Sequence, residues 1–150
     1  MEIHKIMHNK KDYIDLLLLA DEQEDMIDLY LDRGEMYILE DDGVKAVAVV
    51  TDEGDRVAEI KNIAVSRESQ GRGYGRCMIE YLCKKYMHTY EYMQVGTGDS
   101  PLTIPFYEKC GFERYDVIEN FFTDNYDHPI YECGVLLKDM IILRKKLTNK

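Results

Sequence analysis

The residues from Gln70 to Arg76 combine glycines and arginines in a pattern that suits the binding of an anion. Glycine stands at positions 71, 73 and 75. Because glycine lacks a Cβ, the backbone there can bend sharply and a bulky ligand can approach its amides. Arg72 and Arg76 bring guanidinium groups, whose geometry matches that of phosphate oxygens. These residues therefore predict a site for a phosphate or a pyrophosphate.

A strand before this turn and a helix after it would position the amides. The stretch Val57–Val65 is rich in β-branched residues and ends where polar loop residues begin, which indicates a strand. Downstream, apolar side chains recur at helical spacing and predict a helix over residues 75–86. The first amides of a helix have no partner within it, and the helix dipole is positive at that end. A turn in this position is typical of a phosphate site.

Two other interpretations of the same turn are left open, and a third is excluded. A nucleotide-hydrolysing P-loop ends in Gly-Lys-Ser/Thr, whereas this turn ends in Gly75, Arg76 and Cys77. A dinucleotide-binding protein has glycines spaced G-x-G-x-x-G, which this turn lacks, although Glu91 lies where a ribose-binding acid would fall. That fold usually opens with parallel βαβ units, but the strands expected before this turn are joined by short turns. A glycine-rich turn without a ligand is the other alternative.

The remaining pattern predicts a single domain over residues 1–150, since a chain of this length forms one core. Helical periodicity over residues 13–33 is interrupted by the acidic run 21–25, which indicates two helices. Asp42 and Gly43 lie between apolar runs and indicate a hairpin. The expected strands cover 2–7, 36–39, 45–50, 57–65, 90–95, 112–117 and 136–147, and a short helix covers 102–109.

Composition and charge favour a soluble globular protein and exclude several classes of function. Hydrophobic residues make up 45% and charged residues 32% of the chain. The net charge of −10 argues against a nucleic-acid partner and favours cationic substrates. No stretch is apolar enough to span a bilayer and no signal segment opens the chain, so we expect no membrane partner, a cytoplasmic location and reduced cysteines. The four histidines lack metal-ligand spacing, so we expect no metal.

Three blocks of the sequence resemble one family, in the same order. Gln70–Gly75 has the Q/R-x-x-G-x-G/A spacing of the GNAT superfamily of acetyl-CoA-dependent N-acetyltransferases. The strand Ala58–Val65 and the block Pro105–Phe112 also resemble the core of that family. The resemblance implies a single-domain α/β (α+β) fold, in which a central, mixed and mostly antiparallel sheet is flanked by helices. Two adjacent parallel strands of that sheet would splay apart.

The resemblance also implies that acetyl-CoA is the co-substrate. The opened strand edge would hydrogen-bond the pantetheine arm, and the glycine-rich turn would hold the pyrophosphate, mostly through amides. Ser100 stands where the family often has an asparagine that contacts the coenzyme, and this departure leaves its contact in doubt. The cofactor-binding residues expected on this basis are Ile63, Ala64, Val65, Gln70, Gly71, Arg72, Gly73, Tyr74, Gly75, Arg76 and Ser100.

Two residues are expected to carry the chemistry. An ammonium group with a pKa near ~10.4 must lose a proton before it attacks, and the departing thiolate benefits from a proton donor. Glu59 lies on a strand that resembles the one carrying the general-base glutamate of histone-modifying relatives; in a regular strand it shares a face with Lys61. Tyr107 takes the place of the family's general-acid tyrosine. An ion pair for Glu59 and a core position for Tyr107 are the structural alternatives.

The acceptor is the least determined part of this interpretation. In the resembled family the two opening helices border the acceptor groove, which implies that the acids of the run 21–25 meet a cationic substrate; the alternative, which we favour, is a solvated helix joint. The aromatic and acidic segment 119–132 suits an acceptor pocket as well as a packed loop or a homodimer contact. We expect a primary amine, and specifically a small cationic one, to attack acetyl-CoA directly. The rival interpretation is a non-catalytic acyl-CoA-binding or regulatory module of the same fold.

Overall fold

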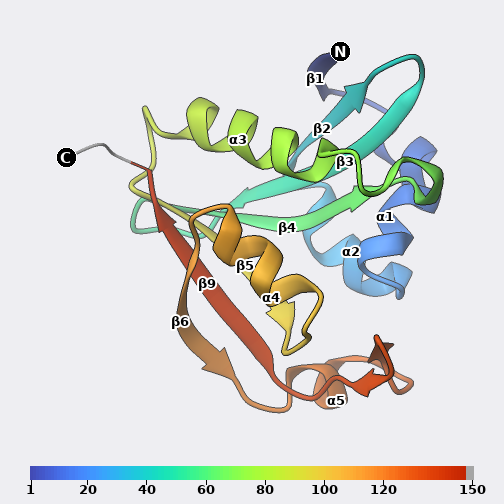
Figure 1. The fold of residues 1–150 in the computed structure, drawn as a ribbon, viewed down its shortest axis with the longest axis vertical. Helices are drawn as coiled ribbons and strands as arrows, with labels where there is room; N and C mark the ends of the chain where they lie inside the picture. Colours follow the sequence, from blue (N-terminus) through green and yellow to red (C-terminus); the bar gives the residue numbers. More distant parts are fainter. Residues whose placement is uncertain (148–150) are drawn as a thin grey trace.

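The computed structural model describes residues 1–147 and contains a seven-stranded sheet with helices on both faces (Figure 1). The strand order is β1-β2-β3-β4-β5-β9-β6, and β7 and β8 form a separate two-stranded sheet. The strands are β1 (Glu2–Ile6), β2 (Glu35–Glu40), β3 (Val44–Asp52), β4 (Val57–Val65), β5 (Tyr92–Gly98), β6 (Glu113–Ile118), β7 (Tyr131–Glu132), β8 (Val135–Leu136) and β9 (Met140–Lys146). The helices are α1 (Ile14–Ala20), α2 (Glu24–Leu31), α3 (Tyr74–Tyr86), α4 (Thr103–Lys109) and α5 (Phe121–Asn125), with 3-10 turns at Lys10–Tyr13 and Arg67–Ser69. Within residues 1–147, no helix has the length and apolar character needed to cross a membrane.

Strands β2, β3 and β4 form an antiparallel meander, as their turn residues predict, and β1 pairs antiparallel with β2 at its edge. Asp42 and Gly43 both adopt positive φ, 58° and 102°, in the turn between β2 and β3. Alternate residues of β2 enter two different hydrophobic cores: Tyr37 packs on one face of the sheet, and Met36 on the other. Strands β2 and β3 are therefore buried on both sides, which explains why they are apolar along most of their length instead of alternating with polar residues.

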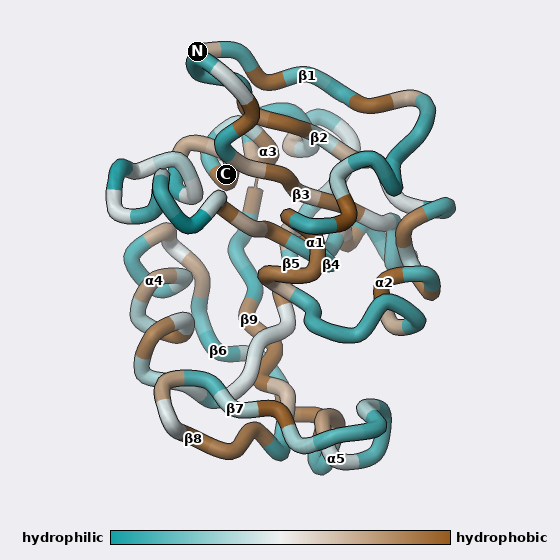
Figure 2. The backbone as a smooth tube through the Cα atoms, turned by 90° about the vertical axis from the view of Figure 1, so that its right-hand side faces the viewer, coloured by the Kyte–Doolittle hydropathy of each residue, from teal (hydrophilic) through white to brown (hydrophobic). Residues whose placement is uncertain are grey.

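Helices cover the two faces unequally. The larger core includes Met78, Ile79 and Leu82 of α3 together with Ile104 of α4, whereas the smaller core lies under α1 and α2. Figure 1 shows α3 and the α1–α2 pair on opposite sides of the sheet. In Figure 2 the tube is largely brown, and so hydrophobic, along β3 between these layers. The central strands are thus held rigidly, and they are the strands that border the cavities described below.

The parallel strands β4 and β5 pair over only part of their length. The pairing runs from Val57 with Tyr92 to Ile60 with Val95 and then stops, although β4 continues to Val65 and β5 to Gly98. On its other side, β5 pairs with β9 along its full length. The two strands therefore splay apart at their carboxyl ends, as the sequence comparison implies. The backbone edge of β4 that faces β5 is free from Lys61 onward.

Two elements differ from what the sequence predicts. The single strand expected over 136–147 is interrupted: β8 ends at Leu136, and β9 begins at Met140 and inserts between β5 and β6. Strand β4 is also irregular, because Val49 pairs with Asn62 and Val50 with Ile60, which leaves Lys61 as an extra residue. Such a β-bulge changes which side chains share a face of the sheet.

Candidate functional site

A cavity of about 510 Å³ lies where β4 and β5 part, and we call it the strand-end cavity. Its walls come from the carboxyl halves of β4 and β5, from α4, from the end of α1 and from the segment that carries α5 and β7. Four residues with expected coenzyme contacts line it: Ile63, Ala64, Val65 and Gln70. The opened strand edge thus forms one wall of an enclosed space, where a ligand can hydrogen-bond the free backbone groups of β4.

The glycine-rich turn has the geometry expected of an anion site. Gly71 and Gly73 have φ of 81° and 86°, a left-handed conformation that favours glycine, and an added Cβ on either would meet no protein atom within 4 Å. The amides of residues 71 to 76 donate no hydrogen bond to any residue from 1 to 147. Gln70 instead closes the turn by donating from Nε2 to the Val65 carbonyl, 3.1 Å away. The start of α3 therefore presents a row of free amides to the solvent.

The two arginines of the turn do not belong to the cavity walls. Arg76 lies on the exposed side of α3, with its Nε 3.6 Å from Glu80. Neither Arg72 nor Arg76 lines the strand-end cavity. Tyr74 anchors the turn to the β2–β3 hairpin, since its hydroxyl donates to Asp41 Oδ2 at 2.7 Å. Guanidinium contact with a phosphate group would therefore have to come from outside the cavity, where both side chains are exposed.

Tyr107 lies in the wall of the strand-end cavity and belongs to the larger hydrophobic core as well. Its ring makes edge contacts with Phe106 and Phe112, at centroid distances of 5.3 and 5.9 Å. Only 7% of the residue is exposed, and burial raises the pKa of its phenol well above the ordinary value. The hydroxyl is thus kept protonated beside the cavity, which is the state that a proton donor requires.

Glu59 lines a second cavity of about 490 Å³ on the α2 side of the sheet, which we call the helix-side cavity. Its carboxylate is 6% exposed and holds two partners: Gln94 donates from Nε2 to Oε1 at 2.6 Å, and Lys61 Nζ lies 3.0 Å from Oε2. Lys61 shares this side of the sheet with Glu59 as expected. The strand is not regular, however: the bulge also turns Asn62 to this side, where it donates to the Leu17 carbonyl.

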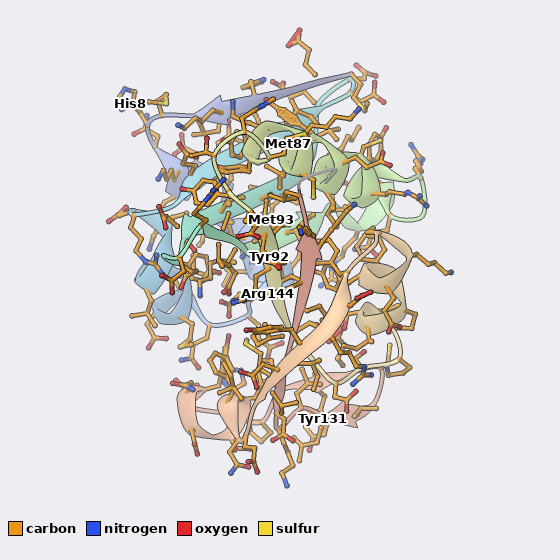
Figure 3. The ribbon with its side chains drawn as sticks, turned by 90° about the vertical axis from the view of Figure 1, so that its left-hand side faces the viewer. His8, Met87, Tyr92, Met93, Tyr131 and Arg144 are labelled. Atoms are coloured by element: carbon orange, nitrogen blue, oxygen red, sulfur yellow. The ribbon has the colours of Figure 1, made fainter. Side chains whose placement is uncertain are left out.

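A chain of polar contacts across the sheet fixes the Glu59 carboxylate. Arg144 of β9 donates from Nε to Gln94 Oε1 at 2.8 Å, so that Gln94 presents its NH₂ group to Glu59. The Arg144 guanidinium lies over two aromatic rings, 5.5 Å from the centroid of Tyr92 and 3.8 Å from that of Tyr115. Figure 3 shows Arg144 beside Tyr92 at the middle of the sheet. The sequence gives no local signal for this chain of contacts, because its members come from three strands.

The two cavities meet, and six residues line both: Asp21, Ile60, Lys61, Gly96, Tyr126 and Met140. The two strands β4 and β5 form the floor of this junction. Above it, Tyr126 donates from its hydroxyl to Asp21 Oδ1 at 2.6 Å, although the two residues are 105 positions apart. The prediction that the acidic run is a solvated helix joint is therefore wrong for Asp21, while Glu24 and Asp25 of the same run are exposed as expected.

The segment 119–132 lines both cavities and also packs against the rest of the protein, so the two roles expected for it are compatible. Phe122 and Tyr126 stack at a centroid distance of 5.7 Å, and both border the strand-end cavity. Further along, the amide of Asp127 donates to Gln23 Oε1 and His128 Nε2 lies 2.9 Å from Glu22. The segment is thus tied to the α1–α2 loop over three successive residues.

Ser100 does not line either cavity. It is 2% exposed, and its hydroxyl accepts the Leu102 amide at 3.1 Å at the start of α4. Burial raises the pKa of the Glu132 carboxyl in the neighbouring cavity wall. Among the residues expected to bind the coenzyme, Ser100 is therefore the one that the structure places apart.

Comparison with known proteins identifies the family. The family model described as "Acetyltransferase (GNAT) domain" matches residues 32–114. A Bacillus subtilis protein described as the uncharacterised N-acetyltransferase YvbK is 36% identical over 132 residues, which cover 86% of this chain and 85% of that one.

Two solved structures are similar over nearly the whole chain. A GNAT family acetyltransferase from Elizabethkingia anophelis, solved with acetyl-CoA bound, is 35% identical with a TM-score of 0.91, and 97% of each chain is covered. A Bacillus subtilis acetyltransferase in complex with CoA is 33% identical with a TM-score of 0.89, over 97% of this chain and 98% of that one. With the splayed strands, the free amides and the two joined cavities, these matches show that the chain belongs to the GNAT family of acetyltransferases.

Proposed function

We propose that this acetyltransferase transfers the acetyl group of acetyl-CoA to a primary amine, a small cationic one, by direct attack in a ternary complex. The observation that carries the proposal is the junction of the two cavities above β4 and β5. Acetyl-CoA in the strand-end cavity would present its thioester there, and an amine entering from the helix-side cavity would reach it. The similar structures from Elizabethkingia anophelis and Bacillus subtilis, solved with acetyl-CoA and with CoA, support the choice of co-substrate.

The coenzyme would be held mainly by backbone groups. The free edge of β4 at Ile63, Ala64 and Val65 would bind the pantetheine arm, and the unpaired amides of residues 71–76 would bind the pyrophosphate. Arg72 and Arg76 would then contribute charge from the exposed side. Ser100 is the weakest member of the expected set, since its hydroxyl is already engaged within the protein.

In the reaction, the amine nitrogen attacks the thioester carbonyl carbon, a C–N bond forms and the C–S bond breaks. Glu59 takes the proton released from the nitrogen, directly or through a water molecule, because it lies in the cavity from which the amine arrives. Tyr107 gives its proton to the departing sulfur. Cys110, whose thiol pKa is raised by burial, lines neither cavity, which favours direct attack over an acetyl-cysteine intermediate.

The proposal is tested by measuring the release of the CoA thiol from acetyl-CoA across a panel of amines. We expect release that depends on both the enzyme and a primary amine, and an acetylated product by mass spectrometry. If acetyl-CoA binds but no amine in the panel releases thiol above the rate in buffer, the rival interpretation of a binding module is favoured. The extent of the domain over residues 1–150, the cytoplasmic location and the homodimer stay predictions.

A further inference from the structure

One carboxylate at the junction is partly buried without a cation from residues 1–147 beside it. Four carboxylates line the helix-side cavity: Asp21, Glu53, Glu59 and Asp116. Glu53 lies 3.2 Å from Arg33 and 4.0 Å from Lys61, and Glu59 lies 3.0 Å from Lys61. Asp116 is exposed to solvent. Asp21 is half-buried, and no lysine or arginine from residues 1–147 lies within 4.0 Å of it.

The hydrogen bonds of Asp21 orient its charge without neutralising it. Tyr30 donates to Oδ2 at 2.9 Å, and Tyr126 donates to Oδ1 at 2.6 Å. Burial raises the pKa of this carboxyl despite both bonds, because the charged form is partly removed from water. A carboxylate has about four lone-pair positions, of which the two phenols take two. A cation that enters the junction would compensate this charge.

A second open acceptor belongs to the same hydrogen-bond network. Asn62 donates from Nδ2 to the Tyr30 hydroxyl at 3.1 Å, and it lines the strand-end cavity. The residue is 3% exposed, and its amide oxygen Oδ1 has no hydrogen-bond partner in the described part of the chain. Buried polar atoms are rarely left unpaired in a folded protein. The network thus holds a second acceptor that no group within residues 1–147 satisfies.

The walls beyond the junction suit an apolar body. The aliphatic and aromatic residues of the helix-side cavity are Met26, Leu29, Ile118, Phe121 and Ile142, in addition to those at the junction. Leu29 is 67% and Ile118 is 44% exposed, so apolar surface is open to a ligand there. The basic residues Arg33 and Lys61 line the same cavity, but they pair with Glu53 and Glu59 and leave the charge of Asp21 uncompensated.

We propose that Asp21, held between Tyr30 and Tyr126, binds the ammonium group of the acceptor, and that the acceptor is a primary amine with an apolar body. This inference rests on the proposed function, since it names the class of amine that the same site takes. Because the amine must lose a proton before attack, Asp21 would act in recognition, at the entrance to the reacting position, and not as the general base.

Binding measured in the complex with CoA tests the inference without turnover. We would titrate CoA-saturated protein with 2-phenylethylamine, with its neutral counterpart 2-phenylethanol, and with spermidine. We expect the wild type to bind 2-phenylethylamine more tightly than either of the others. In Asp21→Asn, the affinity for the amine should fall about 10- to 100-fold, as for the loss of a charged hydrogen bond, while that for the alcohol is unchanged.

The controls separate recognition from a structural effect. Asp25→Asn makes the same charge change on the exposed surface of α2, outside both cavities, and should leave amine binding unchanged. Tyr126→Phe removes one phenol but keeps the charge, so its effect on amine binding should be smaller than that of Asp21→Asn. Equal losses for amine and alcohol in Asp21→Asn would overturn the inference, as would a wild type that binds the alcohol or spermidine as well as 2-phenylethylamine. Thiol release is scored separately: if binding behaves as expected but no amine is acetylated, the proposed function fails and this site stands.

Discussion

Alanine at Gly73, compared with alanine at Gly54, tests whether the turn before α3 holds the pyrophosphate. The two glycines have nearly the same backbone strain, with φ of 86° and 85°, and an added Cβ meets no protein atom within 4 Å at either. Gly54 lies in the turn between β3 and β4, at the opposite end of β4, and lines neither cavity. The pair therefore differs in place and not in conformation.

Both substitutions should lower stability by a similar amount. A residue with a Cβ loses about 1–2 kcal/mol in the left-handed conformation. For a chain of this size, each kcal/mol lowers Tm by about 2–4 °C, so we expect a fall of about 2–8 °C in each variant, measured by thermal unfolding without ligand.

Only Gly73→Ala should weaken coenzyme binding. The open space beside Gly73 is where the pyrophosphate would lie, and the loss of one hydrogen bond to a charged group corresponds to about 1.5–3 kcal/mol, or a 10- to 100-fold rise in Kd for CoA. S-acetylpantetheine, which lacks the pyrophosphate, should be used equally well by Gly73→Ala and Gly54→Ala. If the two variants bind CoA with the same affinity, the pyrophosphate does not lie on this turn.

Four further predictions concern the reaction and the fold. Glu59→Gln should lower kcat about 10²- to 10⁴-fold, with the Kd for CoA unchanged by calorimetry; an unchanged kcat contradicts its role as base. Arg144→Met should lower kcat less, because it removes only the group that orients Gln94, and the effect should disappear in the Glu59→Gln background. Burial raises the pKa of the Tyr107 phenol, and the protonated phenol is the form that donates, so kcat should not decline from this group up to about pH 10. A decline of kcat below that pH that Tyr107→Phe abolishes would refute this. Leu82→Ala, at a fully buried position of α3, should lower the free energy of unfolding by about 2–5 kcal/mol, measured with denaturant. A decrease of less than about 1 kcal/mol would argue against the packing described.

Elements whose signal is local could be predicted from the sequence. Strand β4 has the bounds expected from its β-branched residues, and the two helices before Gly34 separate at the acidic run as expected. The splayed strand pair follows from the family resemblance, and the pairing that stops at Ile60 confirms it. Local residue patterns therefore predict an element correctly where the segment's own residues determine its structure.

Features that depend on contacts between distant residues could not be predicted. No glycine or proline marks the bulge at Lys61, and a regular strand would place Asn62 on the face of Ile60 instead of the face of Glu59. The bond between Asp21 and Tyr126 joins the acidic run, expected to be a solvated helix joint, to the segment 119–132, whose role the sequence leaves open. The interruption before β9 arises where the Asp139 carboxylate accepts the Asn120 amide, a contact that apolar periodicity cannot reveal.

The position of β9 has a consequence for how the chain is made. This strand follows every other element in order, yet it lies in the interior of the sheet between β5 and β6. During synthesis, β5 therefore has an open edge until residues 140–146 have left the ribosome. Until then the junction of the two cavities also lacks Met140, which lines both. A nascent chain at this stage exposes one edge of β5 and the whole of β6, which within residues 1–147 pairs only with β9. Open strand edges associate with other chains, so rapid completion of translation or a holding chaperone would protect it.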